Sequence, residues 1–236
     1  MSIKQSTINI FKDVLHLIYP RICAGCGTPL VKNEDIICLM CYIKLPRTGF
    51  NLDKDNPIEK IFWGRVEIEF ASSFLYFRKE GLTQQLIHQL KYKNRQDIGI
   101  FLGELFALEI KDLMDEKKID IITTVPLHPA KLLKRGYNQS DSIAQGFAAK
   151  SDVIFIPDLI IRNENTSTQT LKKRYERWEN MADKFSLNSK YNIENKKILL
   201  IDDVITTGST LEACSNIIVK DSNTKISLLS LCYAVH

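Results

Sequence analysis

The sequence lacks the glycine-rich signatures of two common nucleotide-binding classes. It contains no G-x-x-x-x-G-K-[ST] segment, which excludes a P-loop ATPase, and it contains no G-x-G-x-x-G segment. It also has no low-complexity stretch and no internal repeat. A phosphate site in this chain would therefore be built from another type of loop, on an ordinary folded domain.

Long apolar runs are missing as well. The longest ones fall far short of the roughly 20 residues that span a membrane. Near the N-terminus, Lys12, Asp13 and His16 interrupt the region where the apolar segment of a signal peptide should lie. We therefore expect a cytoplasmic protein without stable membrane insertion. Apolar residues at helical spacing predict a short amphipathic helix over residues 6–18, which packs on its own domain or, alternatively, lies on a membrane surface.

Charge of one sign is not in large excess. The 236 residues include 32 basic and 28 acidic ones, and the net charge of +4 permits nucleic acid binding without arguing for it. The chain is long enough for one domain with a sizeable core and a small appendage. Because residues 46–60 are polar and rich in turn formers, they predict a linker or surface loop. We therefore expect two parts, residues 1–48 and residues 60–236.

Four of the six cysteines form two C-x-x-C pairs. The pairs are Cys23 with Cys26 and Cys38 with Cys41, separated by turn-forming and polar residues. They predict a structural Cys₄ zinc site, because each tight turn directs two thiolates at one metal ion and no position is left open for chemistry. The alternatives are two disulfides or reduced thiols, and without an export signal disulfides are disfavoured.

An apolar run followed by two acids and a hydroxyl-rich loop is the most informative stretch. Ile198–Ile201 predicts a strand buried on both faces of a parallel sheet. Asp202 and Asp203 follow at its carboxyl end, where ligands collect in open α/β sheets. A helix should come after the loop, with Ser209 as N-cap and Glu212 completing a capping box. The loop consists of Thr206, Thr207, Gly208, Ser209 and Thr210.

This stretch has the chemistry of a phosphate site. Backbone N–H groups at a helix start lack internal partners and lie at the positive end of the helix dipole. Gly208 lets the backbone approach an anion, and the carboxylates suit sugar hydroxyls or a cation. One ligand that fits both halves is a ribose 5-phosphate. The alternative is a buried strand whose acids cap a nearby helix.

A second loop, residues 126–139, carries basic and polar residues. It lies between a strand predicted over residues 119–125 and a helix predicted over residues 140–150. At the end of a neighbouring strand it would face the Asp202–Thr210 loop and hold a pyrophosphate. The alternative is an ordinary basic turn before a helix. The candidate pyrophosphate ligands are His128, Lys131, Arg135, Gly136, Asn138 and Gln139.

The remaining patterns predict an α/β fold. Strand–helix alternation from residue 119 onward favours a doubly wound, mostly parallel sheet. The other predicted elements are strands or a hairpin over residues 66–77, helices over 83–93 and 98–114, a strand over 155–161, a helix-like segment over 169–180, a helix ending near 220 and a last strand over 225–235.

Ile198–Thr210 resembles the signature of type I phosphoribosyltransferases. It has four hydrophobic residues, two acids, two hydrophobic residues and T-T-G-x-T, in that order. The resemblance implies a type I phosphoribosyltransferase fold that binds phosphoribosyl pyrophosphate with Mg²⁺. It also implies that Asp202 and Asp203 bind the ribose hydroxyls and that Thr206–Thr210 binds the 5-phosphate.

Several motifs in one order resemble the competence protein ComF family. They are P-L-H-P at residues 126–129, K-R-G-Y-N-Q at residues 134–139, the segment from Gln169 to Asn180, and the D-D-V-x-T-T-G-x-T loop, all behind the N-terminal cysteine pairs. The resemblance implies a role in the uptake or processing of transforming DNA. Possible partners are single-stranded DNA and other competence proteins.

Two functions from different classes remain open. The first is a transferase in which a nitrogen nucleophile displaces pyrophosphate from ribose C1, while Mg²⁺ neutralises the leaving group. The second is a non-catalytic protein that keeps the fold for regulation or for binding single-stranded nucleic acid. For the transferase, the candidate catalytic residues are Asp202, Asp203, Lys134 and Arg135. The candidate residues of a flexible loop that closes over the pyrophosphate are Gln169, Lys173, Arg174 and Arg177.

Overall fold

A five-stranded parallel sheet forms the centre of the computed structural model, which describes residues 20–50, 55–163, 184–220 and 223–235. Its strand order is β1-β7-β6-β2-β3, and each pair of neighbouring strands is parallel. The predicted doubly wound parallel sheet is thereby confirmed. The strands are β1 (Ala71–Phe77), β2 (Ile121–Thr124), β3 (Ile154–Phe155), β6 (Lys197–Ile205) and β7 (Lys225–Ala234).

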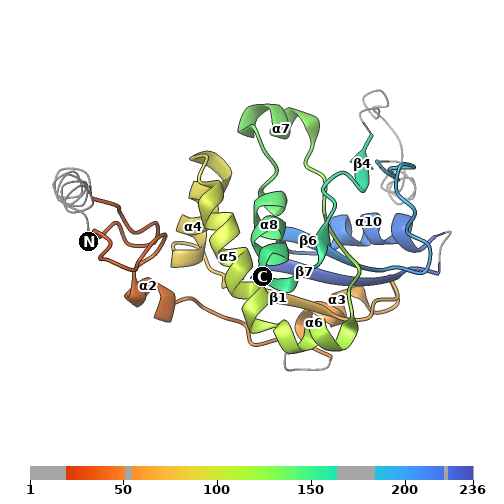
Figure 1. Ribbon diagram of the computed structural model, residues 1–236, viewed down its shortest axis with the longest axis horizontal. Coiled ribbons are helices and arrows are strands. Elements are labelled where there is room, and N and C mark those ends of the chain that lie inside the picture. The colour runs from red at the N-terminus through yellow and green to blue at the C-terminus, as the bar shows by residue number, and fades with distance from the viewer. Residues whose placement is uncertain (1–19, 51–54, 164–183, 221–222, 236) are drawn as a thin grey trace, which may run out of the picture.

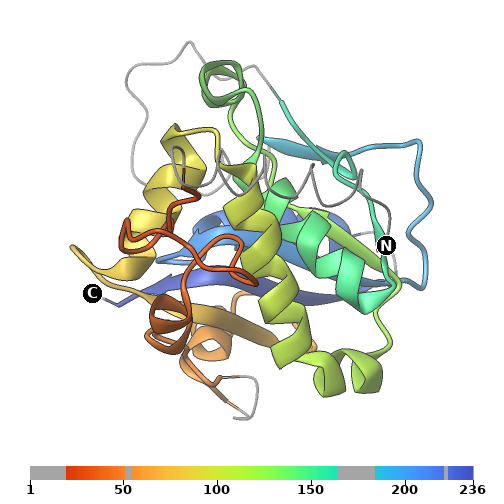
Figure 2. The same ribbon diagram turned by 60° about the vertical axis from the view of Figure 1, so that its left-hand side comes forward.

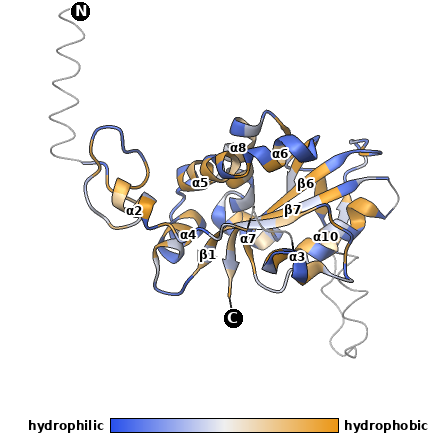
Figure 3. Ribbon diagram, turned by 90° about the horizontal axis from the view of Figure 1, so that it is seen from below, coloured by the Kyte–Doolittle hydropathy of each residue, from blue (hydrophilic) through white to orange (hydrophobic). Residues whose placement is uncertain are grey.

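Helices cover both faces of this sheet (Figure 1, Figure 2). On one face lie α4 (Leu82–Tyr92), α5 (Gln96–Glu109) and α8 (Gln139–Ser151), and on the other lie α3 (Pro57–Phe62) and α10 (Ser209–Val219). The apolar run of β6 serves both layers, because alternate side chains of a strand point to opposite faces. Leu199 and Ile201 belong to one core cluster, whereas Ile198 and Leu200 belong to the other. Much of β6 and β7 is accordingly coloured as hydrophobic in Figure 3.

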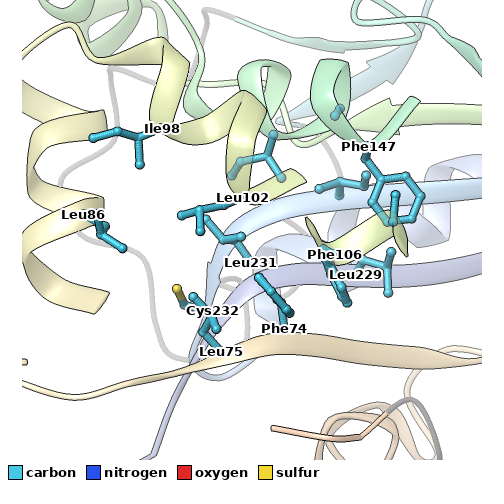
Figure 4. Close-up of a cluster of buried hydrophobic side chains, with 14 of the residues drawn as sticks. Phe74, Leu75, Leu86, Ile98, Leu102, Phe106, Phe147, Leu229, Leu231 and Cys232 are labelled. Carbon is cyan, nitrogen blue, oxygen red and sulfur yellow. The ribbon is translucent and has the colours of Figure 1, made fainter. Parts of the chain in front are cut away.

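The larger core cluster lies between the sheet and α4, α5 and α8 (Figure 4). Phe74 and Phe106 stack with their ring centroids 5.2 Å apart, and Phe147 meets Phe106 edge-on. Helices α5 and α8 approach each other very closely. A Cβ atom on Gly103 of α5 would lie only 2.0 Å from the carbonyl oxygen of Ile143 in α8, so only glycine fits there. This close contact fixes α8, which begins beside the candidate site.

Three sequence-based boundaries were wrong. The sheet begins with β1 and not near residue 119. The helix predicted over residues 98–114 is two helices, α5 and α6 (Lys111–Lys117), which meet at Ile110. The strand predicted over residues 155–161 is divided between β3 of the main sheet and β4 (Ile160–Arg162), which pairs antiparallel with β5 (Phe185–Leu187). Pro157 accounts for this division, since proline cannot donate a hydrogen bond to the sheet.

The segment predicted as a linker takes part in the fold. The backbone N–H of Tyr76 donates to the carbonyl of Pro46 at 2.8 Å, and that of Thr48 donates to Phe74 at 3.0 Å. Asn56 then caps α3 by accepting from the N–H groups of Ile58 and Glu59. Residues 46–48 therefore extend the edge of the sheet beside β1.

The N-terminal cysteine segment packs against α4. It includes the short helix α2 (Leu39–Ile43), and Cys23, Ala24 and Cys41 join the core cluster under α4. The Gln89 amide on α4 donates a hydrogen bond to the Ala24 carbonyl. The helices predicted over residues 6–18 and 169–180 lie outside the described residues. None of the helices that the structure describes is both long and apolar enough to cross a membrane.

Candidate functional site

The two adjacent acids lie at the carboxyl end of β6, as the sequence predicted. Asp202 and Asp203 lie near the C-terminal end of this central strand, which ends at Ile205. A short loop then leads into α10. Asp202 and residues 204–211 line a small hollow of about 40 Å³. Asp202, the loop and the first turn of α10 thus surround one space.

The start of α10 differs from the predicted capping box. Gly208 is the N-cap, with φ 72° and ψ 0°, and Ser209 is already the first helical residue. No side chain caps this helix; the Ser209 hydroxyl lies 3.0 Å from that of Thr207. The left-handed conformation costs glycine less than any other residue, because glycine has no Cβ. The loop backbone can therefore turn sharply, and no side chain occupies the place of an N-cap acceptor.

Glu212 has another role than the one predicted. Its carboxylate forms an ion pair with Arg65, which lies after α3. Arg65 also donates to the carbonyl oxygens of Ile61 and Thr207, each at 2.9 Å. A Cβ atom on Gly208 would lie 2.8 Å from Ile61 Cγ2. Arg65 and α3 together hold the loop from its outer side.

Asp202 is a carboxyl group in a desolvated position. Its Oδ1 accepts hydrogen bonds from the Ser140 hydroxyl of α8 at 3.2 Å and from the Asp203 N–H at 2.8 Å. Burial, and then the neighbouring charge of Asp203, raise the pKa of Asp202 to about 7. Asp202 therefore changes its charge near neutral pH.

Asp203 is paired with a cation from another part of the chain. The Lys91 ammonium, at the end of α4, lies 2.8 Å from Asp203 Oδ2, and both side chains are largely shielded from solvent. Basic residues at the end of a helix usually extend into solvent, where they interact favourably with the negative end of the helix dipole. The structure shows instead that Lys91 reaches into the site. The proximity of Lys91 and Ser140 to the acids was not predicted, because it depends on helix packing, which no local pattern reveals.

The second loop contains a helix that projects from the sheet. This helix, α7 (Pro129–Arg135), has no buried residue, and it stands apart from the layers in Figure 1. The His128 imidazole accepts from the Ala130 N–H at 3.2 Å, and Gly136 ends the helix in the left-handed conformation. Lys131 and Lys134 are exposed on it. These basic side chains are therefore free to meet an anion in solution.

The C-terminal part of the same loop is built into the protein. Asn138 caps α8 and donates to the Val125 carbonyl at 3.0 Å and to Asp141 at 2.9 Å. Gln139 is buried and accepts from Arg135. Burial raises the pKa of Asp141, whose carboxylate also accepts from Thr124. Asn138 and Gln139 thus hold the loop in place through their own hydrogen bonds.

This loop and the end of α4 are joined. The Tyr137 hydroxyl donates to the Leu90 carbonyl, and the Arg135 guanidinium lies over the Tyr92 ring, 5.3 Å from its centroid. The structure therefore places the two loops and the end of α4 around the carboxyl ends of β2 and β6. The candidate flexible-loop residues Gln169, Lys173, Arg174 and Arg177 lie outside the described residues.

The four N-terminal cysteines converge on one point. Their sulfur atoms all lie within 4.8 Å of one another, close to the separation of about 3.8 Å that tetrahedral Zn–S bonds impose. Cys23 Sγ accepts from the backbone N–H groups of Gly25, Cys26 and Cys38, which stabilises a thiolate. A hydrogen bond from Thr28 lowers the pKa of Cys26 to about 6. The donor set fits a zinc ion, and the predicted geometry of a Cys₄ site is present.

Comparison with known proteins yields relatives named for competence and DNA utilization. The chain is 32% identical over 139 residues to "Competence protein F" of Haemophilus influenzae, which covers 57% of this chain and 61% of that protein. It is 28% identical over 234 residues to "DNA utilization protein YhgH" of Escherichia coli, a match that covers 92% of this chain and 98% of that protein. It is 28% identical over 135 residues to "Competence protein ComFC" of Streptococcus pneumoniae, covering 57% and 58%. The predicted resemblance to the ComF family is confirmed, and no family model matches.

The solved structures that resemble this one are phosphoribosyltransferases. Glutamine phosphoribosylpyrophosphate amidotransferase from B. subtilis matches with a TM-score of 0.41 and 19% identity, over 61% of this chain and 30% of that one. Adenine phosphoribosyltransferase from Saccharomyces cerevisiae matches with a TM-score of 0.33 and 19% identity, over 66% and 72%.

Proposed function

We propose that this chain, a relative of competence and DNA utilization proteins, binds phosphoribosyl pyrophosphate with Mg²⁺ at the carboxyl end of β6. One observation carries the proposal: Asp202, which is followed directly by Asp203, shares a hollow with a loop that enters α10 through a left-handed glycine. Hydroxyl-binding acids and phosphate-binding N–H groups on either side of one small space fit a phosphorylated sugar.

The two halves of the hollow would divide the ligand between them. The first N–H groups of α10 have no partner within the helix, and with the hydroxyls of Thr207 and Ser209 they would hold the 5-phosphate. Asp202 and Asp203 would accept from the ribose hydroxyls. Mg²⁺ suits the carboxylates and the pyrophosphate oxygens, and it would neutralise the pyrophosphate charge.

If the chain is a transferase, the reaction is a displacement at ribose C1. A nitrogen nucleophile forms the new C1–N bond and loses a proton, while the C1–O bond breaks and pyrophosphate departs with the electron pair. Positive charge develops on the ribose ring in such a step, so Asp202 and Asp203 would hold the ring from its hydroxyl side. Lys134 and Arg135, with the flexible-loop residues, would neutralise the leaving group.

Calorimetry and thermal unfolding with phosphoribosyl pyrophosphate and Mg²⁺ test the proposal. A ligand that binds only the native state raises its melting temperature. We expect such a rise for the wild type and a much smaller one for Asp202→Asn combined with Asp203→Asn. The matched control combines Asp112→Asn and Asp115→Asn, two exposed acids of α6 far along the chain from the loop. Equal affinity in the site variant and the control variant would show that the ligand binds elsewhere.

A second candidate function is the binding of single-stranded DNA, which the names of the relatives and the exposed lysines of α7 favour. If about four phosphates are neutralised, log K should fall with log salt with a slope near −3, from about 0.7 per phosphate. Lys131→Ala with Lys134→Ala should flatten this slope and weaken binding to all sequences alike. Absence of salt-dependent affinity at low ionic strength would leave DNA handling to partner proteins.

A further inference from the structure

Lys91 is the feature of the site that the proposed chemistry has not yet used. It is the second-last residue of α4, and its ammonium lies 2.8 Å from Asp203 Oδ2. The lysine side chain is 20% exposed and that of Asp203 is 16% exposed. An ion pair with this little exposure to solvent is stronger than a surface pair, so Asp203 stays paired with Lys91 when no ligand is present.

A ribose hydroxyl and the Lys91 ammonium compete for the same acceptor. Both are hydrogen-bond donors, and the carboxylate of Asp203 offers both of them its oxygen atoms. A ligand whose hydroxyls bind the acid pair would therefore displace the ammonium at least in part. Displacement alone would leave a positive charge in a poorly solvated place, which is costly unless another anion replaces the carboxylate.

In the proposed complex, the pyrophosphate of phosphoribosyl pyrophosphate would supply that anion. It is attached to C1 of the ribose, and C1 is bonded to the carbon that carries the 2-hydroxyl. A lysine ammonium ends a flexible chain of four methylene groups and can move over a few ångströms without any change in the backbone. When the ribose hydroxyls displace the Lys91 ammonium from Asp203, the ammonium would thus reach the pyrophosphate oxygens by a motion of the side chain alone.

Contacts of its two neighbours in the chain hold Lys91 beside the second loop, residues 126–139. The carbonyl of Leu90 accepts from the Tyr137 hydroxyl, and the next residue, Tyr92, lies under Arg135. Both contacts join the end of α4 to the loop that is predicted to hold pyrophosphate. The backbone that carries Lys91 is therefore held against that loop, while the Lys91 ammonium contacts Asp203.

We propose that Lys91 is a specificity-determining residue of this site, which pairs with Asp203 in the empty protein and with the ligand's pyrophosphate in the complex. The proposal rests on the proposed function. It assigns to Lys91 a share of the preference for ribose 5-phosphate that carries a pyrophosphate at C1 over ribose 5-phosphate without it. Lys91 makes no favourable contribution to binding of the shorter ligand, because displacing its ammonium from Asp203 is then uncompensated.

Measuring the affinities of two ligands for three proteins distinguishes this role of Lys91 from a structural role. Affinities for phosphoribosyl pyrophosphate and for ribose 5-phosphate, both with Mg²⁺, are measured for the wild type, Lys91→Met and Lys150→Met. Lys150 is a matched control, since it is also a helix-borne lysine paired with a carboxylate, that of Glu104 at 3.5 Å, on the α5–α8 surface. Lys91→Gln, which keeps a donor, serves where Lys91→Met does not fold.

We expect Lys91→Met to bind phosphoribosyl pyrophosphate about tenfold or more weakly, since one charge-assisted contact is lost. Its affinity for ribose 5-phosphate should stay equal or rise, and Lys150→Met should resemble the wild type with both ligands. A parallel loss for both ligands would overturn the proposal and make Lys91 a structural residue, as would unchanged affinity for the pyrophosphate ligand. If the wild type binds neither ligand, the proposed function itself fails, and the role of Lys91 fails with it.

Discussion

Replacing Asp202 by asparagine should stabilise the protein above neutral pH. Asp202 lies beside Asp203 on β6, and the groups that face it from the packed helices are Lys91 of α4, the Ser140 hydroxyl of α8 and the Cys214 thiol of α10. Burial outweighs the favourable contacts, so the charged form of Asp202 is disfavoured in the folded state. Asparagine has nearly the same shape and carries no charge.

The size of the effect follows from the pKa of Asp202. Folding raises this pKa from 3.8 to about 7, so the folded protein keeps a proton that the unfolded chain releases above pH 4. The stability of the wild type therefore falls as the pH rises through this window and reaches its lowest level above pH 7. At 1.36 kcal/mol per unit of pKa, the loss amounts to about 4 kcal/mol at most. Asp202 lines the hollow, and water there reduces the figure.

Urea unfolding of wild type and Asp202→Asn at several pH values between 4 and 8 measures this effect. The two proteins should be about equally stable near pH 4, and the variant should become progressively more stable than the wild type toward pH 8. Other titrating groups, such as Asp141 and Glu109, are present in both proteins and cancel in the difference. Asp112→Asn controls for the change in net charge. A variant that is less stable than the wild type at pH 8, or a difference that does not vary with pH, would refute the argument.

Two further predictions concern the metal site and the loop. The protein should purify with one zinc ion per chain, and elemental analysis of Cys38→Ser should find little or none, because the site then has three thiolates and folding of the N-terminal segment is coupled to metal binding. Zinc-free protein prepared without chelators would contradict this. Gly208→Ala should cost about 2–4 kcal/mol in urea unfolding, from the left-handed backbone and the overlap with Ile61 and Phe62. Gly136→Ala, also left-handed but with no atom within 4 Å of its added Cβ, should cost only about 1–2 kcal/mol, and equal costs would show that packing against α3 is unimportant.

The parts of the site that follow one another along the chain could be predicted from the sequence. The run Ile198–Ile201 is apolar at every position, and only a strand buried on both faces of a sheet accommodates this over four residues with two acids behind it. The two C-x-x-C pairs likewise fix their own local geometry. In both cases the residues that carry the chemistry lie within a few positions of the pattern that reveals them.

Competition between neighbouring residues explains the errors at element ends. Ser209 is a good N-cap in any helix, and Glu212 stands at the proper spacing, so the local signal for a capping box was present. It failed because Arg65 engages Glu212 and because Gly208 takes the left-handed conformation one residue earlier. The division of residues 155–161 had a visible signal in Pro157, which the apolar pattern around it obscured.

The ion pair between Lys91 and Asp203 could not be predicted from the sequence. Leu86 and Leu90 are fully buried, and helical periodicity places Lys91 at the border between that buried face and solvent. Which way a border residue turns depends on how the helix is rotated about its axis, and in α4 contacts on two sides decide this. Gln89 donates to the Ala24 carbonyl of the cysteine segment, while the Leu90 carbonyl accepts from Tyr137. The rotation of α4, and with it the pairing of Lys91 with Asp203, is thus set by two segments that no pattern within α4 can specify.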